Sequence, residues 1–186
     1  MNPATAHGLA RIVSIALHPF AVFAGLTVLA AWMLDRESLA RVLSGLGVAI
    51  GVVWLFVAHR VRSGRWGTVD ASRRRERPLL YALILLVLAL LWVWLGAASP
   101  LARGVAAAIA MLGLAAVLNR WIKLSLHMAS LAFAGVAAWP LSPLGGMAAI
   151  ALLPLLAWSR LRLSRHTWPE ILGGTALGAL AGLATW

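Results

Sequence analysis

Long apolar runs separated by short polar segments constrain the fold of this chain more than any other feature. Four of them, residues 9–34, 40–58, 79–97 and 101–118, have the length of roughly 20 residues that a helix needs to cross a bilayer. Hydrophobic residues make up 62% of the 186-residue chain, whereas soluble domains contain about 45–50%. We therefore expect an all-α, polytopic membrane protein and exclude a soluble domain.

The C-terminal part contains shorter apolar runs. Residues 127–139 and 144–158 flank a Pro-Leu-Ser-Pro segment, which predicts a helical hairpin whose arms are short for a span. The last run, residues 171–186, is rich in Gly and Ala and suits close helix packing. Because further spans follow, we expect the first run to be retained as a membrane helix and not cleaved as a signal peptide. The pattern predicts one integral-membrane domain, residues 1–186, with six or seven helices.

The charged residues gather on one face of this expected bundle. Residues 59–78, 119–127 and 159–170 are separated by two spans each, so these loops meet on the same side of the membrane. They hold twelve of the basic residues. The opposite loops hold three, namely Arg36, Arg41 and Arg103. The positive-inside rule then places the charged face in the cytoplasm of a multi-pass protein of the inner (plasma) membrane.

The net charge of +11 does not indicate nucleic-acid binding. The basic residues lie in short loops between apolar runs, where they act as topology signals and bind anionic lipid headgroups. The chain contains no cysteine, which excludes disulfides, thiol catalysis and thiolate metal sites. The bilayer and a membrane lipid are therefore the expected partners. Nothing in the sequence specifies an oligomeric state.

Three polar segments on the charged face, residues 70–78, 123–127 and 159–170, carry side chains that phosphate-ester chemistry requires. A phosphomonoester dianion must be held by several cations and N–H donors, and the planar fork of arginine suits it. Arg77 and Arg160 are the best candidates. A helix that begins near residues 125–127 would also direct free backbone N–H groups at the anion. Charge beside a bilayer is costly, which marks segment 159–170 as a candidate functional site.

The third segment resembles the third motif of the type 2 phosphatidic acid phosphatase (PAP2) superfamily. That motif is Ser-Arg, five residues, His, three residues and Asp. Here Ser159 and Arg160 are followed after five residues by His166 and after three more by Glu170, so glutamate replaces aspartate.

The other two segments resemble the remaining PAP2 motifs in part. The second motif, Pro-Ser-Gly-His, is matched at Ser125 and His127, with leucine before each of them. The first motif, a lysine, six residues and Arg-Pro, is matched at Arg77-Pro78, with Asp70 at the lysine position. The chain is most similar to divergent bacterial members that place a helical hairpin between the first two motifs. The motifs cover under a third of the chain, whereas the alternation of motifs and spans covers most of it.

The resemblance implies a PAP2-like helical bundle that hydrolyses a lipid phosphate or pyrophosphate, of polyprenyl or glycerolipid type, without a metal or other cofactor. It implies that His166 is the nucleophile and forms a phosphohistidine, that Glu170 orients and polarises its ring, and that His127 is the general acid. Ser125 would donate to a phosphate oxygen. The expected phosphate-binding cations are Arg77, Arg160 and Lys123, the last in place of the missing lysine. Further candidates are Asp70, Arg74 and Ser159.

Structural roles compete with these assignments. Thr167 and Glu170 have the spacing of a capping box, with Pro169 in the first turn, and both roles of Glu170 are compatible. Several arginines fit simple positive-inside anchors, and an isolated histidine on an apolar face is more often a packing residue. His18 precedes Pro19, which kinks a helix and frees a carbonyl, so a hydrogen-bonding role is expected there.

Two other functions compete with a phosphatase. A degenerate PAP2-like protein would bind lipid headgroups or scaffold a partner without catalysis, consistent with the departures from the motifs. A UbiA-like prenyltransferase is the weaker alternative, because such enzymes bind magnesium through two aspartate-rich motifs. Asp70 is the only aspartate after Asp35.

Overall fold

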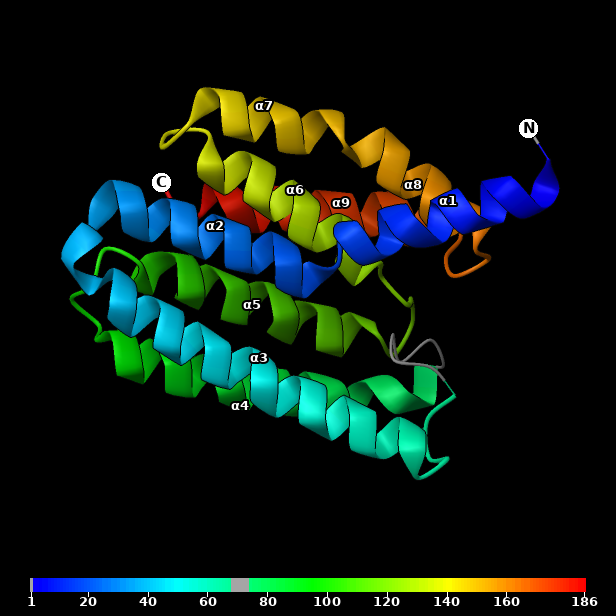
Figure 1. Ribbon diagram of the computed structural model, residues 1–186, viewed down its shortest axis with the longest axis horizontal. Coiled ribbons are helices and arrows are strands. Elements are labelled where there is room, and N and C mark those ends of the chain that lie inside the picture. The colour runs from blue at the N-terminus through cyan, green and yellow to red at the C-terminus, as the bar shows by residue number, and fades with distance from the viewer. Residues whose placement is uncertain (1, 68–73) are drawn as a thin grey trace.

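The chain is all-helical, as the apolar runs predict (Figure 1). The computed structural model describes residues 2–67 and 74–186. Within these residues it contains nine α-helices, two short 3-10 helices and no strand. The α-helices are α1 (Pro3–Ala16), α2 (Pro19–Leu34), α3 (Leu39–Arg62), α4 (Arg77–Leu95), α5 (Ala102–Leu118), α6 (Leu126–Ala138), α7 (Pro143–Ala151), α8 (Leu153–Arg162) and α9 (Trp168–Leu183).

The expected six or seven helices become nine because two of the apolar runs are interrupted near prolines. Between α1 and α2 the chain bends by 40°. Pro19 begins α2, where a missing N–H costs nothing, and the His18 ring caps the new helix by accepting from the Phe20 amide. Leu152 likewise separates α7 from α8, and Pro154 lies in the first turn of α8.

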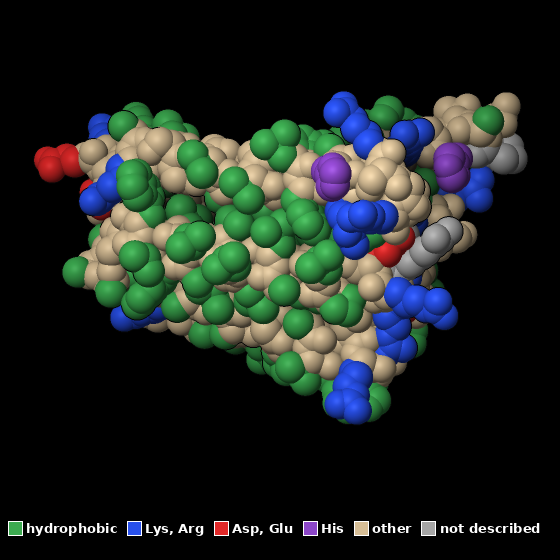
Figure 2. Space-filling model, turned by 90° about the horizontal axis from the view of Figure 1, so that it is seen from below, with side chains coloured by type: hydrophobic (Ala, Val, Ile, Leu, Met, Phe, Trp, Pro, Cys, Tyr) green, Lys and Arg blue, Asp and Glu red, His purple; other side chains and the backbone are tan. Residues whose placement is uncertain are grey.

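Several helices are long and apolar enough to cross a membrane. Three described segments qualify by length and composition, Arg36–Arg62, Arg74–Leu95 and Pro143–Arg162, and the bent α1–α2 pair would make a fourth. Large apolar side chains on the outside of the bundle fit lipid contact. Leu55 and Val93, for example, are 74% and 69% exposed. Figure 2 shows such side chains spread over the middle of the molecule.

Helix α6 lies at the centre and packs most closely against α9. Gly174, Gly178 and Gly182 recur every four residues on α9, and a Cβ at Gly178 would approach the Ala129 carbonyl oxygen to 2.0 Å. These glycines therefore let the two backbones touch, as in small-residue packing of membrane helices. This close packing is what the Gly- and Ala-rich run predicts.

The charged loops meet at one end of the bundle. The turns after α5 and α8, the end of α3 and the start of α4 all lie at the right of Figure 1. Basic side chains and histidines gather at one end in Figure 2. The co-facial arrangement predicted from the spacing of the spans is therefore present.

Candidate active site

Three hydrogen bonds tie the polar segments together at the charged end. The Arg77 Nη1 atom donates to the Leu124 carbonyl at 2.8 Å. The Ser125 amide donates to the Glu170 carbonyl at 3.0 Å, and the Lys123 ammonium donates to the Arg165 carbonyl at 2.8 Å. The segment between α5 and α6 thus bridges the start of α4 and the loop that precedes α9.

His166 is held by Glu170, as their four-residue spacing predicts. The His166 Nδ1 and Glu170 Oε2 atoms lie 2.9 Å apart, and the His166 side chain is almost fully buried. The same carboxylate oxygen accepts from the Thr167 amide at 3.1 Å, completing a capping box at the start of α9. The capping and histidine-orienting contacts of Glu170 therefore coexist, because the helix start fixes the carboxylate beside the ring.

The charged end keeps the His166 ring neutral. Burial, followed by the positive charges of Arg160, Arg77 and Lys123, lowers the pKa of His166 to about 2, although a main-chain hydrogen bond with Lys123 offsets part of this. Burial also lowers the pKa of Lys123, and the Glu170 carboxylate opposes that shift. At neutral pH His166 therefore has an unprotonated ring nitrogen, as a nucleophile requires.

Two polar side chains at the start of α6 are buried without a complete set of partners. Ser125 is fully buried, and its Oγ has no hydrogen-bond partner among residues 2–67 and 74–186. The Nε2 atom of His127 is equally without a partner in this part of the chain. The His127 ring also interacts electrostatically with Arg160 and His166. Buried groups of this kind are rare in native proteins, and they mark a place where a ligand can complete the hydrogen bonding.

A small cavity lies beside these residues, with a volume of about 70 Å³. Arg77 and Arg160, respectively 5% and 2% exposed, line it together with His127 and Tyr81. A water needs only about 10–15 Å³ of such space, so the cavity has room for a small polyatomic group. Two buried guanidinium groups and a histidine around such a space suit a phosphoryl group.

Helix α1 supports the site in a way that the sequence did not reveal. The Ser159 hydroxyl donates to the Ala10 carbonyl at 2.6 Å, and the Arg160 Nη1 atom donates to the Ser14 hydroxyl at 2.6 Å. These partners are separated by 149 and 146 residues. Only a serine within an apolar helix could have drawn attention to Ser14, and that is a weak signal.

His18 is a second residue of the site that sequence reasoning missed. Its ring lies 5.2 Å from the His127 ring in an edge-on arrangement, and it lines the small cavity. Its Nδ1 accepts from the Phe20 amide at 3.3 Å, which leaves the proton of the neutral ring on Nε2. His18 therefore has the expected hydrogen-bonding role at the kink between α1 and α2. Its ring also belongs to the candidate site.

Not every candidate residue reaches the cavity. Within the described residues, neither His166, Ser125 nor Lys123 lines it. Ser159 is bonded to α1, and Arg74 donates to the Asn119 carbonyl at the exposed edge. Asp70 lies outside the described residues.

The leucine between Ser125 and His127 lies against the cavity. Leu126 lines its wall where the resembling motif has glycine. The pocket is therefore more apolar at this point than the motif alone would suggest.

Comparison of the chain with family models, with curated proteins and with solved structures finds no match. Among the described residues, no three His, Asp or Glu side chains lie close enough together to hold a metal ion.

Proposed function

We propose that this protein is a PAP2-like integral-membrane phosphatase that hydrolyses a lipid phosphate or diphosphate through a phosphohistidine. One observation carries the proposal: two buried arginines and two histidines from separate segments converge at one end of an apolar helical bundle. One of the histidines is oriented by a carboxylate at 2.9 Å. A lipid phosphate matches this arrangement, because its charged head needs cations and its tail needs an apolar bundle.

The reaction has two steps. The unprotonated nitrogen of His166 attacks phosphorus while the bond to the leaving lipid oxygen breaks. The negative charge of the bound phosphoryl group favours uptake of a proton from water by the His127 ring, which then gives that proton to the leaving oxygen. Water then attacks the phosphohistidine with His127 as the base, and the N–P bond breaks to release phosphate. Glu170 stabilises the positive charge that develops on the His166 ring. Arg77, Arg160 and Ser125 hold the phosphoryl oxygens, and the charge of Lys123 adds to the field.

The arrangement requires a small movement before reaction. The cavity beside His127 and the ring of His166 adjoin the same two arginines, since both arginines interact electrostatically with His166. A phosphoryl group bound between Arg77 and Arg160 would therefore face both histidines once the cavity extends to His166. The Ser125 Oγ and His127 Nε2 atoms have no hydrogen-bond partner in the part of the chain that the structure describes, and hydrogen bonds from the ligand to them would favour that extension.

In this proposal the charged end lies on the cytoplasmic side of the inner membrane, and the helices cross the membrane seven times. The sequence segments 59–78, 119–127 and 159–170 contain twelve basic residues, and the positive-inside rule assigns such segments to the cytoplasm. Trp186 lies at the opposite end (Figure 1). A reporter that is active only outside the cytoplasm, fused after Trp186, should therefore be active; an inactive reporter would reverse the orientation.

The proposed activity is tested by phosphate release from purified protein in vesicles that contain a long-chain lipid phosphate. His166→Ala should reduce release to the background rate, and His59→Ala, at an exposed position on α3, is the matched control. Rapid acid-free quenching should trap an acid-labile phosphoryl group on the wild type but not on His166→Ala. Turnover that survives in His166→Ala would overturn the mechanism.

Two further outcomes separate the alternatives. Binding of a lipid phosphate without any release would identify a headgroup-binding protein. Activity that disappears with a chelator would indicate metal-dependent chemistry of the prenyltransferase kind.

A further inference from the structure

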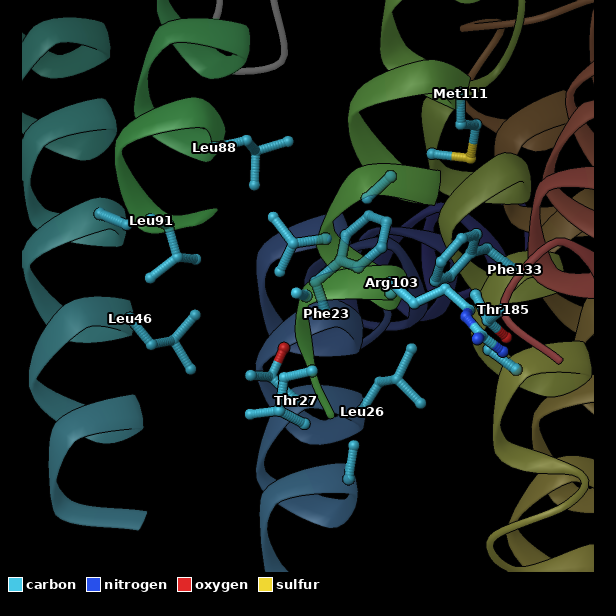
Figure 3. A pocket seen from close by; sticks show the side chains of 18 of the residues that line it. Phe23, Leu26, Thr27, Leu46, Leu88, Leu91, Arg103, Met111, Phe133 and Thr185 are labelled. Carbon is cyan, nitrogen blue, oxygen red and sulfur yellow. The ribbon is translucent and has the colours of Figure 1, made fainter. Parts of the chain in front are cut away.

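A large apolar chamber runs through the interior of the bundle beside the proposed active site. Its volume is about 800 Å³, and helices α2 to α6 form its walls. Figure 3 shows apolar side chains such as Phe23, Leu26, Leu88, Met111 and Phe133 around the space. Protein interiors are normally close-packed, with few voids larger than a water molecule. A space of this size with such walls therefore calls for an apolar occupant.

The chamber adjoins the small polar cavity. Four residues, Pro19, Phe20, Ile84 and Leu126, line both spaces. The two spaces therefore lie side by side, and a molecule with its charged head between Arg77 and Arg160 would pass these four side chains to place its apolar part in the chamber.

The length of the chamber indicates the kind of tail. Its lining follows α2 from Pro19 to Leu34, a distance of about 22 Å at 1.5 Å per residue. A tail of ordinary length occupies one leaflet, about 15 Å of a hydrocarbon core that is about 30 Å thick. The chamber therefore extends beyond the reach of such a tail and crosses most of the membrane.

We propose that this chamber binds the single long chain of the lipid phosphate, and that it selects for chains longer than one leaflet, of the polyisoprenoid type. This inference rests on the proposed function for the identity of the headgroup. At the far end, the Arg103 Nη1 atom donates to the Trp186 carbonyl at 2.6 Å, and both residues line the chamber. This contact lies at the end that the chain tip reaches.

Selection by this chamber depends on fit and not on hydrophobic transfer. The surrounding lipid is as apolar as the chamber walls, so moving a tail from one to the other gains little transfer free energy. A long chain that fills the chamber gains dispersion contacts along its length, whereas a short chain leaves the far half to be filled by other lipid. The dependence of kcat/KM on chain length therefore reports the depth of the chamber.

The test blocks the chamber at half depth or beyond. Ala30→Trp on α2 and Ala49→Trp on α3 place an indole in the chamber from two different walls. Ala21→Trp, at an exposed position on α2, is the matched control. The substrates are isoprenyl phosphates of increasing length, geranyl, farnesyl and solanesyl phosphate, together with a diacylglycerol phosphate, all in the same vesicles. Thermal unfolding of each variant shows whether it is folded.

The wild type and Ala21→Trp should prefer solanesyl over geranyl phosphate. In both chamber variants kcat/KM for solanesyl phosphate should fall about tenfold or more, as apolar pockets discriminate by size, while geranyl phosphate turnover should stay within twofold. Turnover by the wild type that is independent of chain length, or a preference for diacylglycerol phosphate, would overturn the inference and leave the phosphatase in place. A normal preference in folded chamber variants would do the same.

A binding measurement separates this inference from the proposed function. Non-hydrolysable isoprenyl phosphonates of the same lengths should raise the thermal stability of the wild type in order of chain length, and Ala30→Trp should abolish the order. Stabilisation in order of chain length, with no phosphate release from any substrate, would contradict the phosphatase activity and support chain binding in the chamber. Equal stabilisation by all lengths would contradict the chamber.

Discussion

The α6–α9 pair and the α2–α5 group are packed in opposite ways. Helix α6 is buried along most of its length, and the glycines of α9 bring the two backbones into contact. In α3, by contrast, only three of 24 residues are buried, and a chamber of about 800 Å³ lies between parts of α2, α3, α4 and α5. The same apolar composition therefore produces a rigid pair in one region and an open space in the other.

The difference corresponds to the two parts of the proposed reaction. The rigid pair carries Ser125 and His127 at the start of α6 and Glu170 at the start of α9, with His166 just before it. Reacting groups must be held in place closely, because small displacements reduce turnover strongly. The open region only has to surround a tail, for which exact positions matter less.

The largest effect is expected at the contact between α6 and α9. Gly178→Ala would place a Cβ 2.0 Å from the Ala129 carbonyl oxygen, and a backbone atom cannot move aside. We expect a loss of stability of about 3 kcal/mol or more and no turnover, measured by thermal unfolding and phosphate release. Gly113→Ala on α5 is the control, because a Cβ there meets no described atom within 4 Å. Equal behaviour of the two variants would contradict the rigid-pair description.

A smaller effect is expected at Glu170, where capping and catalysis can be separated. Glu170→Gln keeps an oxygen that can accept from the Thr167 amide but removes the negative charge beside His166. We expect turnover to fall about a hundredfold with little change in melting temperature. Glu170→Asp keeps the charge but shortens the reach, so it should lose more stability and less activity than Glu170→Gln. The reverse order would show that Glu170 is mainly a cap.

His18 lies where the two regions meet, and its substitution tests whether it acts on the reaction or only on the start of α2. His18→Ala removes both the cap of α2 and the ring beside His127. We expect its turnover to fall about tenfold and its melting temperature to fall as well. His18→Asn should restore the cap and the stability but not the turnover. Full activity in His18→Asn would mean that His18 acts only through the helix.

The smallest effect is expected in the pH dependence of stability, which depends on how completely the rigid region shields His166 from water. The folded pKa of His166 is about 2, below the ordinary value of 6.5. Between these values the unfolded chain binds a proton that the folded chain does not, so stability is lost as the pH falls below 6.5. When the pH is lowered from 6 to 5, the free energy of unfolding of His166→Gln should fall by about 1 kcal/mol less than that of the wild type. Urea unfolding at the two pH values measures this difference. His59→Gln, at an exposed position, should lose as much as the wild type.

Some parts of the site could be predicted from the sequence because they are local. The His166–Glu170 contact and the capping box follow from a spacing of three or four residues at a helix start. The meeting of the three polar segments followed from counting spans. The bonds of Ser159 and Arg160 to α1 join residues about 150 positions apart and have no local pattern. His18 was noticed for its proline neighbour, but its place beside His127 depends on how α2 and α6 pack.

The sequence alone determined that the chain is helical and apolar, which end collects its charge and which apolar run is suited to close packing. These properties depend on composition and short-range spacing. Tertiary structure decided where two apolar runs break, which buried arginines share a cavity with His127, and that a chamber adjoins it. Apolar side chains of similar hydrophobicity fit a filled core and the wall of a cavity equally well. Only the distance between helix backbones distinguishes the two, and that distance is set by the whole bundle.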